Sequence, residues 1–227
     1  MELSTRLNTI ASILKYRTLV DIGTDHCFLP IFVIKNNIID KALATEISRL
    51  PLAKAKENLI KYNVTNVELQ KSDGFEAIET NFESCVISGM GGRLISEIIT
   101  KNLQKVQKFK QIILSPQNSV EYMRKFLISH NFSIEDEFML VENGRFYNII
   151  ECFPKNTTLN DEDYTKLEYI FGRKLIEKKC PIMLEYAKAE LNKTYKIIQK
   201  LPSYSTRYID LTLYASLCNQ VLREHAI

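Results

Sequence analysis

The sequence predicts an α/β fold followed by a helical domain, and two observations carry this prediction. Through residue 129, short β-branched runs alternate with segments of helical spacing, which is the pattern of strands and crossover helices in a parallel sheet. From Lys155 onward only helical spacing remains. We therefore expect an α/β sandwich over residues 1–154 and an α-helical domain over residues 155–227.

The first half of the sheet domain begins with a helix signal. Apolar residues recur at helical spacing from Leu3 to Leu14, and Ser4 is placed to cap a helix over residues 4–15. Strands and helices should then alternate, with strands at 19–22, 41–47 and 67–70 and helices over 28–35 and 51–62.

The second half continues this alternation and then breaks it. Strands are expected at 85–87 and 112–114, with helices over 94–99 and 120–129. Residues 132–142 and 145–153 then run strand to strand across Glu142-Asn143-Gly144, a turn signal that predicts an antiparallel hairpin. With right-handed crossovers, a ligand crevice lies beyond the carboxyl ends of the parallel strands.

Three helices are expected in the C-terminal part. Tyr164, Leu167, Phe171 and Leu175 mark the first at helical spacing. Two more are expected over 184–201 and 213–221, separated by the break at Leu201-Pro202-Ser203. Spacings of three, four and seven favour a helical hairpin or a short coiled coil.

Composition excludes several classes of protein. The hydrophobic and charged fractions are 45% and 25%, as in ordinary globular domains. Five scattered cysteines and three histidines, without a Cys-x-x-Cys pair, indicate neither a disulfide framework nor a metal site. No apolar run approaches the roughly 20 residues of a membrane span, and no signal-peptide core is present. We expect a cytoplasmic protein that binds no metal and no membrane.

The basic excess lies in the tail. Residues 1–154 carry 18 Lys and Arg against 18 Asp and Glu, whereas residues 155–227 carry 12 against 9. This surplus is compatible with a polyanionic partner such as nucleic acid, but a solvated helix surface can carry a similar charge.

The carboxyl ends of the predicted strands supply a set of small and polar residues. Glu46 lies a little over 20 residues after Gly23. At this spacing a carboxylate can accept hydrogen bonds from the hydroxyl groups of a ribose. Asp73 is placed to accept from an adenine amine, while Phe75 or Ile47 packs on the ring. The full set is Asp21, Gly23, Asp25, His26, Glu46, Asp73, Gly74, Ser88 to Gly92, Pro116, Gln117 and Asn118.

The loop after the first strand distinguishes between two adenosyl ligands. A dinucleotide loop has a second glycine where this chain has Asp25, and a carboxylate there would repel phosphates. The same carboxylate would attract a sulfonium or ammonium group. The loop therefore favours S-adenosyl-L-methionine over a nucleotide with a pyrophosphate.

The motifs resemble those of the bacterial tRNA (adenine(22)-N1)-methyltransferases. They are Asp21-Ile-Gly-Thr-Asp-His-Cys-Phe-Leu-Pro30, Glu46-Ile47, Asp73-Gly74, Gly89-Met-Gly-Gly92 and Leu114-Ser-Pro-Gln117, and the resemblance runs from Leu3 to Phe153. One departure is Ser115-Pro116-Gln117, where some members have Gln-Pro-Asn.

The resemblance implies a Rossmann-like class I methyltransferase domain with a C-terminal coiled-coil domain. The implied reaction uses S-adenosyl-L-methionine, releases S-adenosyl-L-homocysteine and methylates N1 of a D-loop adenosine in tRNA. The expected cofactor-binding residues are Asp21, Gly23, Asp25, Glu46, Ile47, Asp73, Gly74, Phe75, Gly89 and Met90. We expect a monomer without an obligate protein partner.

The methyl transfer needs alignment of N1, the methyl group and the sulfur more than it needs a general base. The reason is that adenine N1 has a free in-plane lone pair at neutral pH. Asp25 could stabilise the cationic product, or it could bind only the methionine amino group. His26 could contact the base or anchor the loop. Gly91 and Gly92 should let the acceptor ring approach, and the substrate contacts would include Pro116, Gln117 and Asn118.

The tail could hold tRNA through charge and stacking. The candidates are Lys188, Lys193, Lys196, Lys200 and Arg207, and the alternative is a solvated helical face. Two other functions remain open: a methyltransferase for another RNA, a protein or a small molecule, and a non-catalytic RNA-binding module.

Overall fold

The computed structural model describes residues 1–78, 81–155 and 164–225. They fall into two compact units, Met1–Asp161 and Glu162–Ile227. The expected domain boundary after residue 154 stays a prediction, since it immediately precedes a stretch outside the described residues.

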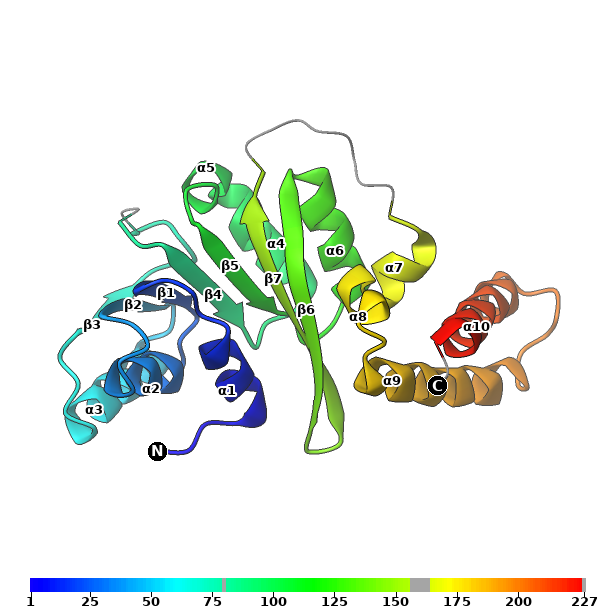
Figure 1. Ribbon diagram of the computed structural model, residues 1–227, viewed down its shortest axis with the longest axis horizontal. Coiled ribbons are helices and arrows are strands. Elements are labelled where there is room, and N and C mark those ends of the chain that lie inside the picture. The colour runs from blue at the N-terminus through cyan, green and yellow to red at the C-terminus, as the bar shows by residue number, and fades with distance from the viewer. Residues whose placement is uncertain (79–80, 156–163, 226–227) are drawn as a thin grey trace. The chain divides into compact units, whose positions relative to one another are not determined.

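The described part of the first unit contains a seven-stranded sheet in the order β3-β2-β1-β4-β5-β7-β6 (Figure 1). Neighbours among β1 to β5 are parallel, whereas β7 runs antiparallel to β5 and β6. The strands are β1 (Thr18–Ile22), β2 (Lys41–Glu46), β3 (Val67–Lys71), β4 (Ser84–Ser88), β5 (Gln111–Ser115), β6 (Phe132–Glu142) and β7 (Arg145–Pro154).

The strand order creates a switch point beside β1. The chain moves outward from β1 to β2 and β3, then crosses back to place β4 on the other side of β1. At such a point the loops after the two neighbouring strands diverge, which opens a crevice at their carboxyl ends. The candidate residues after β1 and β4 are thereby brought to the same crevice.

Helices cover both faces of this sheet. Helices α1, α2 and α3 lie on one face, while α4 packs with α6 on the other (Figure 1). The bounds are α1 (Thr5–Ser12), α2 (Phe28–Lys35), α3 (Arg49–Lys61), α4 (Gly92–Lys101), α5 (Leu103–Val106) and α6 (Val120–Ser129). Each predicted helix of this unit is present, and the short α5 is an addition. Ser4 caps α1, since its side chain accepts from the Leu7 N–H.

Double coverage explains the composition of the central strands. Strand β5 is buried along its whole length, and β1 and β4 are buried at four of five positions, which requires continuous apolar runs in place of alternation. Packing of α1 to α3 against this face buries Ile10, Leu29, Ile31 and Ala55. Each such aliphatic side chain contributes about 1.5–3 kcal/mol of stability when it is fully buried.

The hairpin that ends the sheet is the one predicted from Asn143-Gly144. Both residues have positive φ angles, 50° and 72°, as a two-residue turn of the I′ type requires. The register of β6 against β7 shifts between Ile134 and Asp136.

A buried ion pair links α6 to this hairpin. Arg124 Nε lies 2.6 Å from Glu137 Oε1, and each side chain is 1% exposed. Arg124 also donates to Asn148 Oδ1 on β7. The charges are therefore shielded from water and compensated by each other.

The second unit contains four helices in its described residues: α7 (Lys166–Phe171), α8 (Arg173–Glu177), α9 (Pro181–Ile198) and α10 (Thr206–His225). The prediction of one helix through Tyr164–Leu175 is wrong, because Gly172 interrupts it with a φ of 93°. Helices α9 and α10 pack against each other as a helical hairpin, and a coiled coil is not shown. Among the helices that the structure describes, none is long and apolar enough to cross a membrane.

Removal of one member of the buried pair should destabilise the first unit strongly. Arg124→Met leaves the Glu137 carboxylate buried without its cation, so the free energy of unfolding should fall by about 3–5 kcal/mol in urea denaturation. Lys125→Met is the matched control, because Lys125 pairs with Glu121 at the surface and its loss should cost less than about 1 kcal/mol. Equal losses in the two variants would contradict this assignment.

Candidate active site

The loop after β1 has an unusual backbone. Gly23, Asp25 and Cys27 all have positive φ angles of 70°, 52° and 60°. The N–H groups of Gly23 and Thr24 both donate to the Thr45 carbonyl at 2.9 Å, which ties the loop to β2. The loop therefore has a defined shape at the switch point.

Gly23 lies close to the loop after β4, and its φ of 70° is a conformation that favours glycine. A Cβ atom at this position would lie 2.1 Å from Met90 Cε, so a larger residue would displace the Met90 side chain. Met90 follows β4, and the contact brings the loops after β1 and β4 together.

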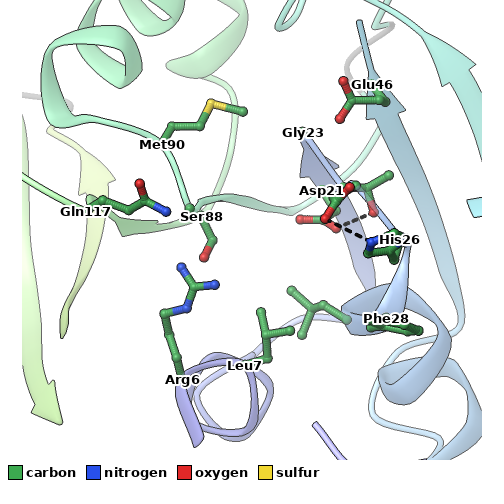
Figure 2. A pocket seen from close by; sticks show the side chains of 14 residues that line it. Arg6, Leu7, Asp21, Gly23, His26, Phe28, Glu46, Ser88, Met90 and Gln117 are labelled. Atoms are coloured by element: carbon green, nitrogen blue, oxygen red, sulfur yellow. Dashed lines mark hydrogen bonds and ion pairs between the residues drawn. The ribbon is translucent and has the colours of Figure 1, made fainter. Parts of the chain in front are cut away.

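A pocket at this junction, called the main pocket below because the predicted strand-end residues line it, has a volume of about 380 Å³, in the range of small-molecule sites. Figure 2 shows its side chains converging from α1 and from the ends of β1, β2, β4 and β5. It is lined by Arg6, Leu7, Asp21, Gly23, Thr24, Asp25, His26, Phe28, Leu29, Glu46, Ser88, Gly89, Met90 and Gln117.

Asp21 lies at the floor of the main pocket. Its carboxylate is 6% exposed and accepts a hydrogen bond from Thr24 Oγ1 at 2.6 Å. Burial raises the pKa of Asp21 to about 6, against the opposing effect of the Thr24 hydrogen bond. The group remains largely ionised at neutral pH and can attract a cationic ligand.

Asp25 and His26 face each other across the rim. His26 Nε2 lies 3.5 Å from Asp25 Oδ2, and their side chains are 44% and 64% exposed. The His26 carbonyl accepts from Asn58 Nδ2 at 2.9 Å, so the residue anchors the loop through its backbone. Both side chains line the main pocket and can contact a ligand there.

A second, smaller pocket of about 160 Å³ shares Gly23, Glu46 and Met90 with the main pocket. The remaining lining residues are Ile22, Ile47, Ser72, Asp73, Gly74, Leu94 and Ile98. Its apolar walls with Asp73 at the edge suit a heteroaromatic ring that carries an amine. Glu46 lies between the two pockets, where its Oε1 accepts the Ser48 N–H at 3.0 Å.

Phe75 does not take the position expected of it. Its side chain is fully buried and packs against Phe109 with ring centroids 5.8 Å apart. The prediction that its ring could pack on a ligand conflicts with this burial. Ile47, the alternative, lines the second pocket and is 55% exposed.

The glycine loop after β4 serves two purposes. Gly89 has a φ of 80° and lines the main pocket. Gly92 instead packs against backbone, since a Cβ there would lie 2.8 Å and 2.9 Å from the carbonyl oxygens of Asn118 and Ser119. A Cβ at Gly91 would meet the Asn118 side chain. Gly91 and Gly92 do not line the main pocket, and the expectation that they leave room for an acceptor ring stays a prediction.

The loop after β5 contributes one side chain to the main pocket. Gln117 lines it, and its N–H donates to the Met90 carbonyl at 2.9 Å. Pro116 is buried, and Asn118 faces Gly91. Pro116 is therefore inaccessible to a ligand, whereas Gln117 and Asn118 are both exposed, and their roles as substrate contacts stay predictions.

Several lining residues were absent from the sequence prediction. Arg6 and Leu7 come from α1, which covers the side of the pocket, while Thr24, Phe28 and Leu29 lie within the predicted loop motif but had no assigned role. Ser88 was within the predicted strand end but had no assigned role. The helical spacing of α1 indicated its apolar side but could not show that Arg6 would face the crevice.

The predicted tRNA contacts lie on the second unit. Lys188, Lys193, Lys196, Lys200 and Arg207 are all exposed. Lys193 forms an ion pair with Glu190 at 3.2 Å, which lowers its availability for another partner. Within the described ranges, no group of three or more His, Cys, Asp and Glu side chains is arranged to hold a metal ion.

Comparison with known proteins identifies the family. The family model described as tRNA (adenine(22)-N(1))-methyltransferase matches residues 19–217. The chain belongs to this family. The match extends from β1 into α10 and so includes both units.

Three relatives illustrate the match. The tRNA (adenine(22)-N(1))-methyltransferase of Bacillus subtilis is 30% identical over 153 residues, which cover 66% of this chain and 64% of that enzyme. The structure of M. capricolum TrmK with S-adenosyl-homocysteine has a TM-score of 0.87 at 28% identity, and covers 98% of this chain and 99% of the other. A Streptococcus pneumoniae protein in complex with S-adenosyl-L-methionine has a TM-score of 0.86 at 27% identity, with coverages of 97% and 100%.

Family membership confirms the Rossmann-like fold, the methyltransferase class and the cofactor expected from sequence. The pockets fit S-adenosyl-L-methionine on chemical grounds. An apolar pocket with Asp73 suits the adenine, Glu46 suits the ribose, and Asp21 and Asp25 suit the positive charges of the methionine half.

The raised pKa of Asp21 predicts a pH-dependent stability difference. Because its folded pKa of about 6 exceeds the ordinary value of 3.8, wild type should lose stability relative to Asp21→Asn as pH rises from about 4 to 6. The difference should reach about 3 kcal/mol, and asparagine retains an acceptor for the Thr24 hydroxyl. Urea denaturation of both proteins at pH 4, 5, 6 and 7 measures it, and a pH-independent difference would contradict the burial argument.

Proposed function

We propose that this chain methylates N1 of adenosine 22 in tRNA. The observation that carries the proposal is the family match over residues 19–217, and the carboxylate-lined pocket supports it. We further propose that the protein acts in the cytoplasm, as a monomer without an obligate protein partner. The proposed location is supported by the five scattered cysteines, which indicate no disulfide framework.

In this proposal a single cofactor molecule would occupy both pockets. S-adenosyl-L-methionine supplies the methyl group from a sulfonium centre. Asp73 would accept from the adenine amine, Ile47 would pack on the ring, and Glu46 would accept the ribose hydroxyls. Asp21 would attract the methionine ammonium, since it stays largely ionised at neutral pH despite its burial.

The acceptor adenine would enter the main pocket beside Gly89 and Gln117. It must first leave its stack or its tertiary pairing in the tRNA. Since N1 has a free lone pair, the residues of the pocket need only hold the base in line with the methyl group, which can lower the barrier by roughly 7–11 kcal/mol. Asp25 at the rim would favour the cationic product.

The second unit would bind the body of the tRNA. Lys188, Lys196, Lys200 and Arg207 are exposed on α9, α10 and the segment between them, and Tyr204 is 86% exposed beside Lys200. Charge neutralisation and base stacking would both contribute.

The reaction is tested with an unmodified tRNA transcript and S-adenosyl-L-methionine labelled on the methyl group. Label should enter the tRNA and appear as 1-methyladenosine after nuclease digestion. A matched transcript with guanosine at position 22 should stay unlabelled. Label confined to protein or a small molecule, or equal labelling of both transcripts, would contradict the proposal.

Separate variants should separate the two binding functions. Glu46→Gln should weaken the binding of S-adenosyl-L-methionine by roughly 10- to 100-fold without a change in tRNA affinity, and Glu68→Gln on β3 is the matched control. The double variant Lys196→Glu and Lys200→Glu should weaken tRNA binding and reduce its salt dependence, without a change in the affinity for S-adenosyl-L-methionine. Calorimetry and filter binding measure these effects, and loss of both affinities in either variant would contradict the division of roles.

A further inference from the structure

Arg93 is an exposed cation at the carboxyl edge of the sheet. It lies in the first turn of α4, shortly after Met90 of the main pocket. The next residue, Leu94, lines the second pocket. Arg93 itself lines neither pocket. Its guanidinium therefore lies next to both pockets but outside the space that a cofactor would occupy.

The ring of Tyr122 holds the guanidinium of Arg93. The two side chains are stacked, with 4.8 Å between Arg93 Cζ and the ring centroid. Tyr122 belongs to the first turn of α6, which packs on α4, and it is 39% exposed. Such stacking fixes the plane of a guanidinium while its N–H groups stay available to an acceptor. Tyr122 thus pre-organises the cation for a ligand.

The nearby carboxylates do not neutralise Arg93. Glu97 lies one turn further along α4, at the spacing of a helical ion pair, yet Arg93 stacks on α6 instead. Glu121, beside Tyr122, is paired with Lys125 at 2.6 Å. Among the residues that the structure describes, Arg93 forms no ion pair with a carboxylate. The stacked guanidinium therefore retains N–H groups for a ligand.

Other arginines of the first unit differ according to the edge on which they lie. Arg17, directly before β1 at the amino edge, forms an ion pair with Asp40. Arg49 begins α3 after β2, and Arg145 begins β7, which runs antiparallel to β5. Both lie at the carboxyl edge, are exposed and have no carboxylate partner within the described ranges. The edge that carries the pockets thus suits a polyanion.

The proposed reaction brings a polyanion to this edge. When the target adenosine leaves its stack, the phosphates on either side of it move with it toward the mouth of the pocket. Phosphate contacts position a nucleic acid without reading its sequence. An arginine fork can donate to two phosphate oxygens at once. Arg93 has the chemistry and the location for such a contact.

We propose that Arg93, stacked on Tyr122, binds a backbone phosphate next to the target adenosine and so positions the base for methyl transfer. Tyr122 is a positioning residue, because it acts through Arg93. The inference rests on the proposed function, which supplies the tRNA. It adds to the first unit a tRNA contact that is separate from those on α9 and α10.

The first test compares Arg93→Met, which keeps the apolar stem, with Lys61→Met as the matched control. Lys61 is also an exposed cation over a tyrosine ring, Tyr62 at 5.5 Å, but it ends α3 at the amino edge. Arg93→Met should raise the KM for tRNA roughly 3- to 10-fold. It should also lower the slope of log affinity against log salt by about 0.7–0.9. Lys61→Met should change neither quantity.

Variants of Tyr122 test the stacking. Tyr122→Leu removes the ring and should raise the KM for tRNA, by less than Arg93→Met does. Tyr122→Phe retains the ring and should keep the wild-type KM. The affinity for S-adenosyl-L-homocysteine should be unchanged in all of these variants, because neither Arg93 nor Tyr122 lines a pocket described above. Thermal melting verifies that each variant is folded.

A neutral linkage in the tRNA locates the phosphate. A methylphosphonate replaces the phosphate on one side of adenosine 22 or on the other, and the matched phosphate substrate carries the same 2′-deoxy sugar before that linkage. On one side the neutral linkage should raise the KM of the wild-type enzyme by about the factor seen for Arg93→Met. Arg93→Met should then add no further loss with that substrate.

Five outcomes would overturn the contact: an unchanged KM and salt slope in Arg93→Met, the same changes in Lys61→Met, an equal weakening of S-adenosyl-L-homocysteine, a Tyr122→Phe variant as impaired as Tyr122→Leu, or additive losses at both linkages. A wild-type protein that neither binds nor methylates the tRNA would contradict the proposed function. A wild type that methylates adenosine 22, with an Arg93→Met variant equal to it, contradicts the contact alone.

Discussion

The backbone conformation of the loop after β1 is the constraint on which the rest of the site depends. Gly23, Asp25 and Cys27 all have positive φ angles there, and the hydrogen bonds from Gly23 and Thr24 to Thr45 fix the loop against β2. Gly23 also lies beside Met90 from the loop after β4 at the switch point of the sheet. The ends of three strands thereby meet around a single cavity.

The charges of this cavity are separated in space. Asp21 and Asp25 lie on the loop side, and Arg6 approaches from α1. Because burial strengthens electrostatic interactions, such a division orients a zwitterionic ligand as well as binding it. The position of Arg6 depends on residues far away in the sequence, since Glu142 on β6 and Tyr147 on β7 contact it.

The periodicity of apolar residues was sufficient to predict the strands and helices of the sheet domain, because apolar runs and helical spacing indicate which residues are buried. The turn glycines and the strand-end carboxylates were also readable, since Asp21 and Glu46 lie in the last two positions of β1 and β2 and Asp73 is the second residue after β3. Phe75 and Gly92 were not: the ring of Phe75 is buried by Phe109, and Gly92 is crowded by backbone from another loop. Such contacts join segments distant in sequence and leave no local pattern. Gly172, by contrast, was visible in the sequence, but the apolar spacing around it concealed the break.

The hydrogen bond between Glu142 and the backbone of Arg6 gives the terminal hairpin an additional importance. Glu142 lies at the end of β6, directly before the Asn143-Gly144 turn, and far in sequence from every motif of the site. The bond ties the end of this hairpin to α1, the helix that contributes Arg6 and Leu7 to the lining of the cavity. A part of the sheet that supplies no lining residue thus helps to hold a helix that does.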